Sequence, residues 1–362
     1  MDSVNGYRER ENVEEISPLV GDVFHVETGG IHGDALRLKG RLLVKPEVAL
    51  EALKERFKER ELTPMLSKRG ESIVLTLARI KPPLSKTRPS LNLLLFLLTV
   101  LTTLFAGSFW QTGSLAGALL NPHRGIPFSS TLLCILGAHE LGHFFTAKRL
   151  GIDTTLPYFI PVPHMIGTLG AVIRIRSPIP NRKALVLMGA AGPLSGMVVA
   201  IPLVIIGLKL STVAPMEEVT GGLIIGSSIM FSLLEKLFIK GVSESQGVFL
   251  HPVAFAGWLG MFVTGLNLLP IGQLDGGHIT YSIFGRSHRQ LGFVFLAMLV
   301  AFGIVFRFPA YAFFGILILL VGFRHPPPLD DVTPLSFAHK AVAALAMVVL
   351  VMTFVPQPFV IP

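Results

Sequence analysis

Long apolar segments alternate with short polar connections over most of the chain, from about residue 91 onward. A run of roughly 20 apolar residues is long enough to cross the hydrocarbon core of a bilayer as a helix. The hydrophobic pattern predicts helices of this kind at 91–110, 127–147, 184–208, 253–269, 291–306, 310–323 and 341–355. The fifth and sixth are short for a full crossing, so the pattern predicts about six to seven transmembrane helices.

The first 90 residues follow a different pattern. Residues 35–44 and 72–78 are typical of strands, and Pro46 opens a segment whose apolar residues recur with helical spacing to about residue 61. We therefore expect a flexible N-terminus at 1–20, a small α/β cytoplasmic unit at 21–81 and a basic, proline-rich linker at 82–90. A membrane-embedded core at 91–329 and a final transmembrane helix with a short tail at 330–362 complete the expected organisation. The predicted fold class is an α-helical polytopic membrane protein with a small N-terminal α/β unit.

Two connections between the expected helices have patterns of their own. Residues 170–176 alternate like a half-buried strand, and a strand at membrane depth needs protein or water to satisfy its backbone. Gly167, Gly170 and Val172 are therefore candidates for a membrane-associated hairpin that pairs with an extended substrate by strand addition. The alternative is an ordinary interfacial loop. The second connection, 227–240, is typical of an amphipathic or partly inserted helix.

Composition supports a membrane protein. The chain is 51% hydrophobic and 15% charged, whereas soluble proteins carry about 25% charged residues. The net charge of +8 arises mostly where basic residues flank the apolar segments, which is typical of positive-inside anchoring rather than of nucleic-acid binding. This distribution predicts a cytoplasmic N-terminus. The N-terminal residues resemble neither a signal peptide nor a transit peptide, so we expect the cell membrane, with a plastid membrane as the alternative.

The chain has one cysteine, Cys134, which excludes an intramolecular disulfide and a thiolate zinc cage. It lies within the second apolar segment. Small apolar filler is the commonest role of such a residue, so we expect Cys134 to be buried.

The same segment contains the motif His139-Glu140-Leu141-Gly142-His143. On a helix, His139 and His143 share one face and can hold one metal ion through their imidazole nitrogens. Glu140 lies where it can act as a general base toward a water at that metal. The other interpretation is a transmembrane helix with a few buried polar residues, but ionisable groups in hydrocarbon are costly and indicate function. The motif therefore predicts one catalytic Zn²⁺ ion.

A catalytic zinc ion needs three protein ligands and one open position. The best candidate for the third ligand is Asp275, because Gly272, Gly276 and Gly277 permit the irregular backbone that would bring its carboxylate to the metal. His278 is a second candidate, which we expect to support the site rather than to bind the ion. Asn267 can donate a hydrogen bond without adding charge.

Four motifs occur in one order: HELGH, then GTLGAVIRIRSPIPNRKAL, then GAAGPLSG, then the NxxPxxxLDG pattern. Together they resemble the site-2 protease family of intramembrane zinc metalloproteases, over about residues 91–329. The resemblance implies zinc held by His139, His143 and Asp275, with Glu140 as catalytic base. It also implies that Asn267 helps to hold or polarise the scissile carbonyl. The connection 167–176 would match the family's hairpin near the active site.

The same resemblance implies single-span membrane proteins as substrates and the lipid bilayer as surroundings, with no nucleic-acid partner. The resemblance leaves the oligomeric state open. No gap between the apolar segments is long enough for a PDZ domain, and we expect no CBS domains. Two rival interpretations are a metal-binding transporter and an inactive relative that acts as a scaffold. Glu140 within the motif argues against the first, and the full set of four site residues argues against the second.

Overall fold

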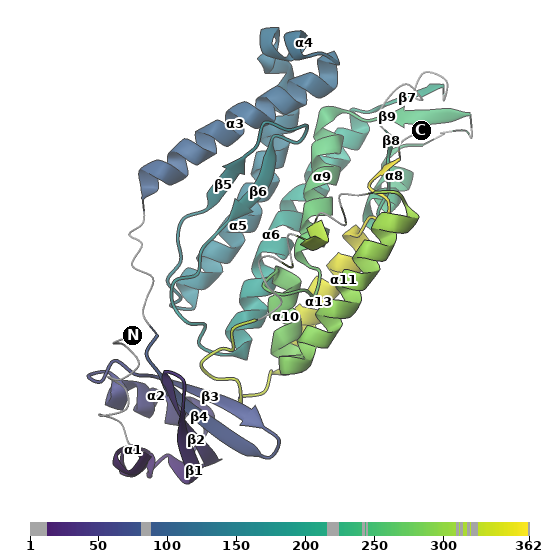
Figure 1. Cartoon of the computed structure of the whole chain (residues 1–362). Helices are drawn as coiled ribbons and strands as arrows, with labels where there is room; N and C mark the ends of the chain where they lie inside the picture. The colour runs from purple at the N-terminus through teal and green to yellow at the C-terminus, as the bar shows by residue number, and fades with distance from the viewer. Residues whose placement is uncertain are drawn as a thin grey trace. The chain divides into compact units, whose positions relative to one another are not determined.

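The computed structural model describes residues 13–80, 88–215, 224–240, 243, 245–308, 311, 314–316, 319 and 325–360 (Figure 1). The chain divides into two compact units. The N-terminal unit comprises Met1–Ser85 together with Arg176–Leu185 and Pro326–Phe337, and the helical unit comprises the rest. Most of the predicted sixth apolar segment, 310–323, and most of the linker 82–90 lie outside the described residues, as do residues 1–12.

The N-terminal unit is built on a four-stranded antiparallel sheet in the order β1-β2-β4-β3. Its elements are α1 (Val13–Val20), β1 (Phe24–His32), β2 (Ala35–Leu42), α2 (Pro46–Phe57), β3 (Thr63–Arg69) and β4 (Ser72–Ala78). The strand predicted at 72–78 is confirmed, and the one predicted at 35–44 is β2. The helix α2 ends at Phe57 rather than near residue 61, because Leu62 turns back to donate to the Phe57 carbonyl and Glu61 has a φ of 55°.

Alternating side chains of this sheet meet the apolar face of α2. Leu36, Leu38, Leu75 and Leu77 are each fully buried, which is the period of two expected when one sheet face meets a helix. Leu53 of α2 is equally buried within the same cluster. The unit therefore has a hydrophobic core of its own.

A later segment of the chain bridges to the edge strand β3. The Leu66 amide donates to the Leu329 carbonyl at 2.7 Å, and the Asp331 amide donates to the Leu66 carbonyl at 2.9 Å. Leu329 is 6% exposed and packs in the core of the unit. Residues 179–181 pair with the other side of this segment through the Ile179 carbonyl, which accepts from Leu329 at 2.9 Å. Isolated bridges therefore join two connections, which lie between apolar helices in the sequence, to the N-terminal unit.

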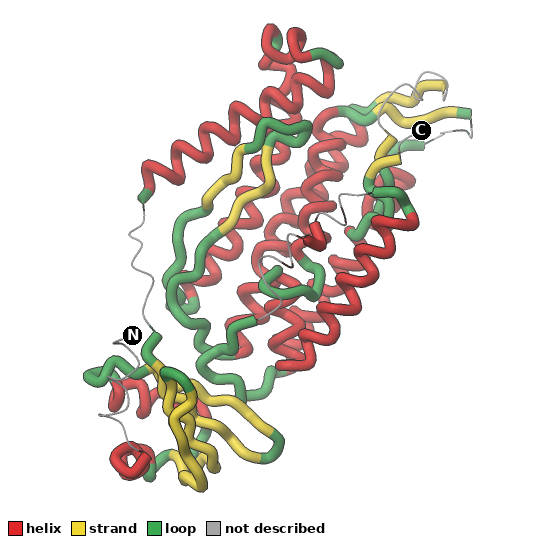
Figure 2. The backbone as a smooth tube through the Cα atoms, viewed as in Figure 1, coloured by secondary structure: helices red, strands yellow, loops and turns green. Residues whose placement is uncertain are grey.

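Among the described residues, the helical unit contains the predicted apolar helices other than 310–323, together with three two-stranded sheets (Figure 2). Its principal helices are α3 (Pro89–Thr112), α5 (Ile126–Arg149), α6 (Arg182–Lys209), α9 (Pro252–Asn267), α10 (Asp275–Phe284), α11 (His288–Val305) and α13 (Phe337–Thr353). The shorter elements are α4 (Leu115–Leu120), η1 (Pro122–Gly125), β5 (Tyr158–Pro161), β6 (Thr168–Val172), β7 (Thr212–Pro215), β8 (Ile224–Ile225), α8 (Ile229–Phe238), β9 (Gln246–Phe249), η2 (Gly285–Ser287) and β10 (Phe359–Val360).

Within the described part of the chain, three helical stretches are long and apolar enough to cross a membrane: Pro89–Thr112, Arg182–Lys209 and the continuous stretch Asp275–Val305. Pro252–Asn267 and Phe337–Thr353 are apolar but shorter. The chain is a multi-pass membrane protein. The amphipathic helix predicted at 227–240 is confirmed as α8, whose N-terminus is capped by the Ser228 side chain accepting from the Phe231 amide.

Helix α5 lies against α3 and α9 and carries the HExxH motif (Figure 1). Its inward side includes Leu132, Ile135 and Leu136, each at most 6% exposed. Cys134 lies on the outward side and is exposed, so the expectation that it is buried is wrong. The outer face of a membrane helix is as apolar as the inner face, so hydrophobic character alone does not identify which residues point inward.

Candidate metal centre

The two histidines of the motif lie on one face of α5 and point toward the same space. His139 is 4% exposed and His143 is 6% exposed. Their Nε2 atoms lie 3.1 Å apart, as the four-residue spacing on a helix predicts. The continuous helix through this motif fixes the two rings relative to each other.

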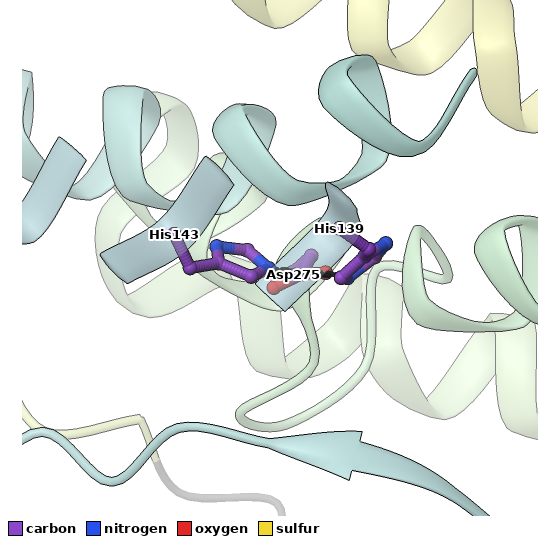
Figure 3. Close-up of side chains that lie close together, drawn as sticks. All are labelled: His139, His143 and Asp275. Carbon is purple, nitrogen blue, oxygen red and sulfur yellow. Dashed lines mark hydrogen bonds and ion pairs between the residues drawn. The ribbon is translucent and has the colours of Figure 1, made fainter. Parts of the chain in front are cut away.

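Asp275 reaches this pair from the first residue of α10 (Figure 3). Its Oδ2 atom lies 3.2 Å from Nε2 of His139 and 3.3 Å from Nε2 of His143. The turn that delivers it depends on glycine: Gly272 has a φ of 54°, and a Cβ on Gly276 would lie 1.8 Å from the Leu268 carbonyl oxygen. The prediction that glycines permit this irregular backbone is therefore confirmed.

These three donor atoms fit a single zinc ion. Nitrogen and oxygen ligands lie about 2.0–2.2 Å from zinc in a tetrahedron, which places neighbouring donor atoms about 3.3–3.6 Å apart. The three distances between the donor atoms of His139, His143 and Asp275 are 3.1, 3.2 and 3.3 Å, and among the described residues this is the one such group of three. Two imidazoles and one carboxylate would leave a fourth position open, as in catalytic rather than structural zinc sites.

The orientation of His143 is fixed by a backbone carbonyl. Its Nδ1 atom lies 2.7 Å from the Met188 carbonyl oxygen on α6. Because a carbonyl oxygen only accepts, Nδ1 carries the proton and the lone pair of Nε2 faces the other two donor atoms. The sequence contained no signal for this contact, since a backbone carbonyl is present at every position.

A glycine face on α6 makes room for the metal-binding residues. A Cβ on Gly192 would lie 2.0 Å from Nε2 of His143, and one on Gly189 would lie 2.6 Å from the Asp275 carbonyl oxygen. Gly196, one turn further along, would place a Cβ 3.4 Å from the Cβ of His139. These small residues permit close packing, and what they admit are the metal-binding side chains themselves.

Glu140 lies beside these donor atoms and lines a cavity of about 240 Å³ together with them. Glu140 is 5% exposed, and the Ile173 backbone N–H donates to its carboxylate. Asn267, the last residue of α9, lines the same cavity. The structure therefore brings the predicted base and the predicted amide to the predicted metal-binding residues.

One wall of the cavity is formed by β6 and the residues that follow it, Leu169 to Ile173 and Ile175. The strand β6 pairs with β5 in a two-stranded sheet, so among the described residues its second edge has no strand partner. Gly170 and Val172 line the cavity, as predicted. Gly167 does not: it lies at the hairpin turn, where its carbonyl accepts a hydrogen bond of 2.6 Å from the Thr102 hydroxyl on α3.

His278 lines the cavity but is not one of the three converging donors, and its supporting role stays a prediction. Its Nδ1 atom lies 2.6 Å from Nε2 of His325. This contact between two histidines was not predicted from the sequence.

Comparison with known proteins places this site in a family. The model for peptidase family M50 matches residues 127–309, which is half of the chain and includes all three donor residues. Two relatives from Arabidopsis thaliana are named as the probable zinc metalloproteases EGY2 and EGY1, chloroplastic. They are 30% and 32% identical over 65% and 64% of this chain, and over 42% and 43% of their own length. The EGY1 protein of Oryza sativa subsp. japonica is 28% identical over 74% of this chain and 50% of its own length.

The chain thus spans half or less of the length of these curated relatives. Their names place them in chloroplasts, and nothing in them supports the cell membrane that the sequence led us to expect. No solved structure matches the chain. The extent of the family match, with the donor set that suits a zinc ion, shows that the chain belongs to peptidase family M50.

Proposed function

We propose that this protein is a zinc-dependent endopeptidase that hydrolyses peptide bonds within or near the transmembrane segments of membrane-anchored proteins. One observation carries the proposal. The three donor residues, Glu140 and residues of the strand β6 line a single cavity within a unit of apolar helices. A metal site that only bound or transported an ion would need neither a base nor a strand edge.

Zinc bound by His139, His143 and Asp275 would polarise the scissile carbonyl and make a water molecule acidic enough to attack at neutral pH. Glu140 takes the proton of the attacking water and then delivers it to the leaving nitrogen. The Ile173 amide restrains the Glu140 carboxylate, which keeps the base oriented without a second charged group. The Asn267 amide can donate to the scissile carbonyl oxygen, where negative charge develops.

The strand β6 supplies a way to bind substrate backbone. A transmembrane helix protects its peptide bonds in internal hydrogen bonds, so it must unwind locally before hydrolysis. An unwound segment that adds to the free edge of β6 regains backbone hydrogen bonds, and side chains then alternate toward and away from the cavity. This arrangement predicts substrates whose helices are weakened by glycine, proline or polar residues near the cleavage position.

The proposal also covers the membrane topology and the substrates. We expect about six to seven membrane crossings and the N-terminal unit on the side of the basic loops, as positive-inside anchoring predicts. The substrates would be single-span membrane proteins, and the lipid bilayer would surround both them and the enzyme. The chemistry requires a bilayer but does not depend on which membrane provides it.

The test is cleavage of a panel of single-span substrates by purified protein in a bilayer, with wild type compared to Glu140→Ala at matched zinc content. Removal of a general base is expected to lower the rate by about 10²- to 10⁴-fold while zinc stays bound. Glu235→Ala is the matched control, because Glu235 is a partly buried glutamate on α8 that does not line the cavity.

Equal cleavage by wild type and Glu140→Ala would show that the activity comes from a contaminant. Absence of cleavage by both, with zinc bound and a measurable metal flux across the bilayer, would favour the transporter instead. Zinc binding with neither cleavage nor flux would favour the inactive scaffold.

A further inference from the structure

The residues from 325 to 331, His-Pro-Pro-Pro-Leu-Asp-Asp, connect the surroundings of the metal site with the sheet of the N-terminal unit; we call them the strap. At the first end, His325 is 7% exposed and holds its hydrogen bond of 2.6 Å with His278. Its ring stacks on Tyr281, with centroids 4.5 Å apart and planes 20° from parallel. Both partners lie on α10, which begins with Asp275, and His278 lines the catalytic cavity.

At the other end, Asp330 of the strap forms isolated β-bridges with Leu66 and Asn181 of the N-terminal unit. Asp330 is 2% exposed, and its carboxylate accepts from the amides of Val332 and Thr333 at 2.9 Å each, which fixes the turn that follows. The Asp330 amide donates to the Pro180 carbonyl at 2.9 Å. Backbone and side chain together hold this residue between β3 and the residues that precede α6.

Asp331 binds the start of α6. Its Oδ1 atom accepts from Nε of Arg182 at 2.7 Å, and the Asp331 side chain is 8% exposed. The next residue, Lys183, forms an ion pair of 2.7 Å with Glu47 of α2, but that pair is largely exposed and contributes less. The helix that begins at Arg182 is the one whose glycine face receives the two metal-binding histidines.

The two ends of the strap are joined by Pro326, Pro327 and Pro328. Each proline has a fixed φ and no amide to donate, so consecutive prolines form a stiff, extended connection.

We propose that the strap is a positioning device for the active site, with His325 and Asp331 as its positioning residues. His325 orients α10, which supplies Asp275, and Asp331 orients the start of α6, which packs on His139 and His143. This inference rests on the proposed function for its effect on activity, but its structural part can be tested without activity. A displacement of about 1 Å at reacting groups can lower a rate by about 100-fold, so small movements suffice.

The first experiment compares wild type with His325→Phe and His325→Gln in a bilayer. Phenylalanine retains the stacking on Tyr281 and removes the hydrogen bond to His278, whereas glutamine keeps a polar group that can bond to it. For His325→Phe we expect faster hydrogen exchange at the amides of α10, retained zinc, and a kcat for substrate cleavage lowered by about 10- to 100-fold with little change in KM. For His325→Gln we expect partial recovery of both exchange protection and kcat.

The second experiment uses Asp331→Asn, with Arg56→Gln as the matched control. Arg56 forms an ion pair of 2.6 Å with Asp22 in the same unit but does not contact the strap. Asp331→Asn should increase exchange at the start of α6 and lower kcat, whereas Arg56→Gln should change neither. Should Asp331→Asn fail to fold, Arg182→Gln removes the same pair from the other side.

Unchanged exchange in α10 for His325→Phe and in α6 for Asp331→Asn would overturn the positioning role, whether or not the wild type cleaves any substrate. Loss of zinc from His325→Phe would also overturn it, because it would make His325 part of the metal site. If exchange changes as expected but neither wild type nor Glu235→Ala cleaves substrate, the proposed function fails and the positioning role stands.

Discussion

At the residue scale, three contacts hold the His143 ring in place. The Met188 carbonyl accepts from its Nδ1–H, the Gly192 backbone lies against its other nitrogen, and that nitrogen faces Asp275. Each contact restricts a different movement of the ring. A metal-binding side chain restrained in this way loses little freedom when the ion binds, which favours tight binding.

Gly192→Ala tests this packing. The added Cβ would lie 2.0 Å from Nε2 of His143, so either the ring or α6 must move. We expect zinc affinity to fall by about 10- to 100-fold, as for other losses of support around a metal. The control is Gly137→Ala on α5, where a Cβ meets nothing within 4 Å and helix propensity improves. Zinc content after dialysis against a metal buffer measures both, and equal retention in the two variants would contradict the packing argument.

The pH dependence of the N-terminal unit can be tested at Asp22. A side-chain hydrogen bond from Arg56 holds the pKa of the Asp22 carboxyl below its usual value, and the pKa of Arg56 is raised for the same reason. Because the folded-state pKa of Asp22 is the lower one, the pair stabilises the unit above the ordinary carboxyl range. That contribution is lost as the pH falls through the folded-state pKa.

The contribution is small because both side chains are solvent-screened. We expect NMR titration of the Asp22 carboxyl carbon to show the lowered pKa in wild type and a return toward the usual value in Arg56→Gln. An identical titration curve in the two proteins would show that Arg56 does not act on Asp22.

At the scale of elements, the strand β6 is the feature that most directly concerns substrate binding. Gly170 in this strand has a φ of 99°, a conformation that side chains other than glycine rarely adopt, and open space surrounds it. A substitution there strains the backbone of the cavity wall without any clash.

Gly170→Ala is therefore expected to lower kcat/KM for membrane substrates by about tenfold, since strain of this kind costs about 1–2 kcal/mol. Zinc content should not change. Gly151→Ala is the matched control, because Gly151 has a φ of 68°, is equally open and does not line the cavity. Cleavage assays on both variants measure the effect on kcat/KM. An equal loss of activity in Gly170→Ala and Gly151→Ala would show general destabilisation instead of an effect on the cavity wall.

Local patterns predicted most elements, and the exceptions have a common reason. The two strands of the N-terminal sheet that the sequence did not indicate, β1 and β3, are its edge strands. The first contains Gly29 and Gly30 and the second contains Pro64, residues that weaken a strand pattern and that sheets tolerate at their edges. The central strands β2 and β4, which are flanked on both sides, had the clearer alternation.

The metal-binding residues were predictable because their signals are local in the sequence. His139 and His143 are four residues apart on one helix, and Asp275 lies among glycines that indicate an unusual turn. Their supports were not predictable, because the Met188 carbonyl and the His325 ring reach the site from distant parts of the chain. Such contacts leave no local periodicity, and only the folded structure brings them together.

At the scale of the whole molecule, zinc should stabilise the helical unit. The three donors come from α5 and α10, and binding one ion links these helices. Ligand binding at 1,000 times its dissociation constant stabilises a fold by about 4 kcal/mol. We expect chelation to lower the thermal unfolding midpoint of wild type and readdition of zinc to restore it. The unfolding midpoint of His139→Ala should not depend on zinc. An unchanged midpoint of wild type after chelation would argue against a bound ion.

The N-terminal sheet also constrains the order in which the molecule is assembled. Leu66 in β3 pairs with Leu329, which is synthesised after every metal-binding residue. On the proposal for the strap, a nascent chain already contains His139, Glu140, His143 and Asp275 but lacks the segment that orders α6 and α10. The active site would then become competent for proteolysis only when synthesis has passed the strap. An incomplete chain would therefore not cleave other membrane proteins beside it.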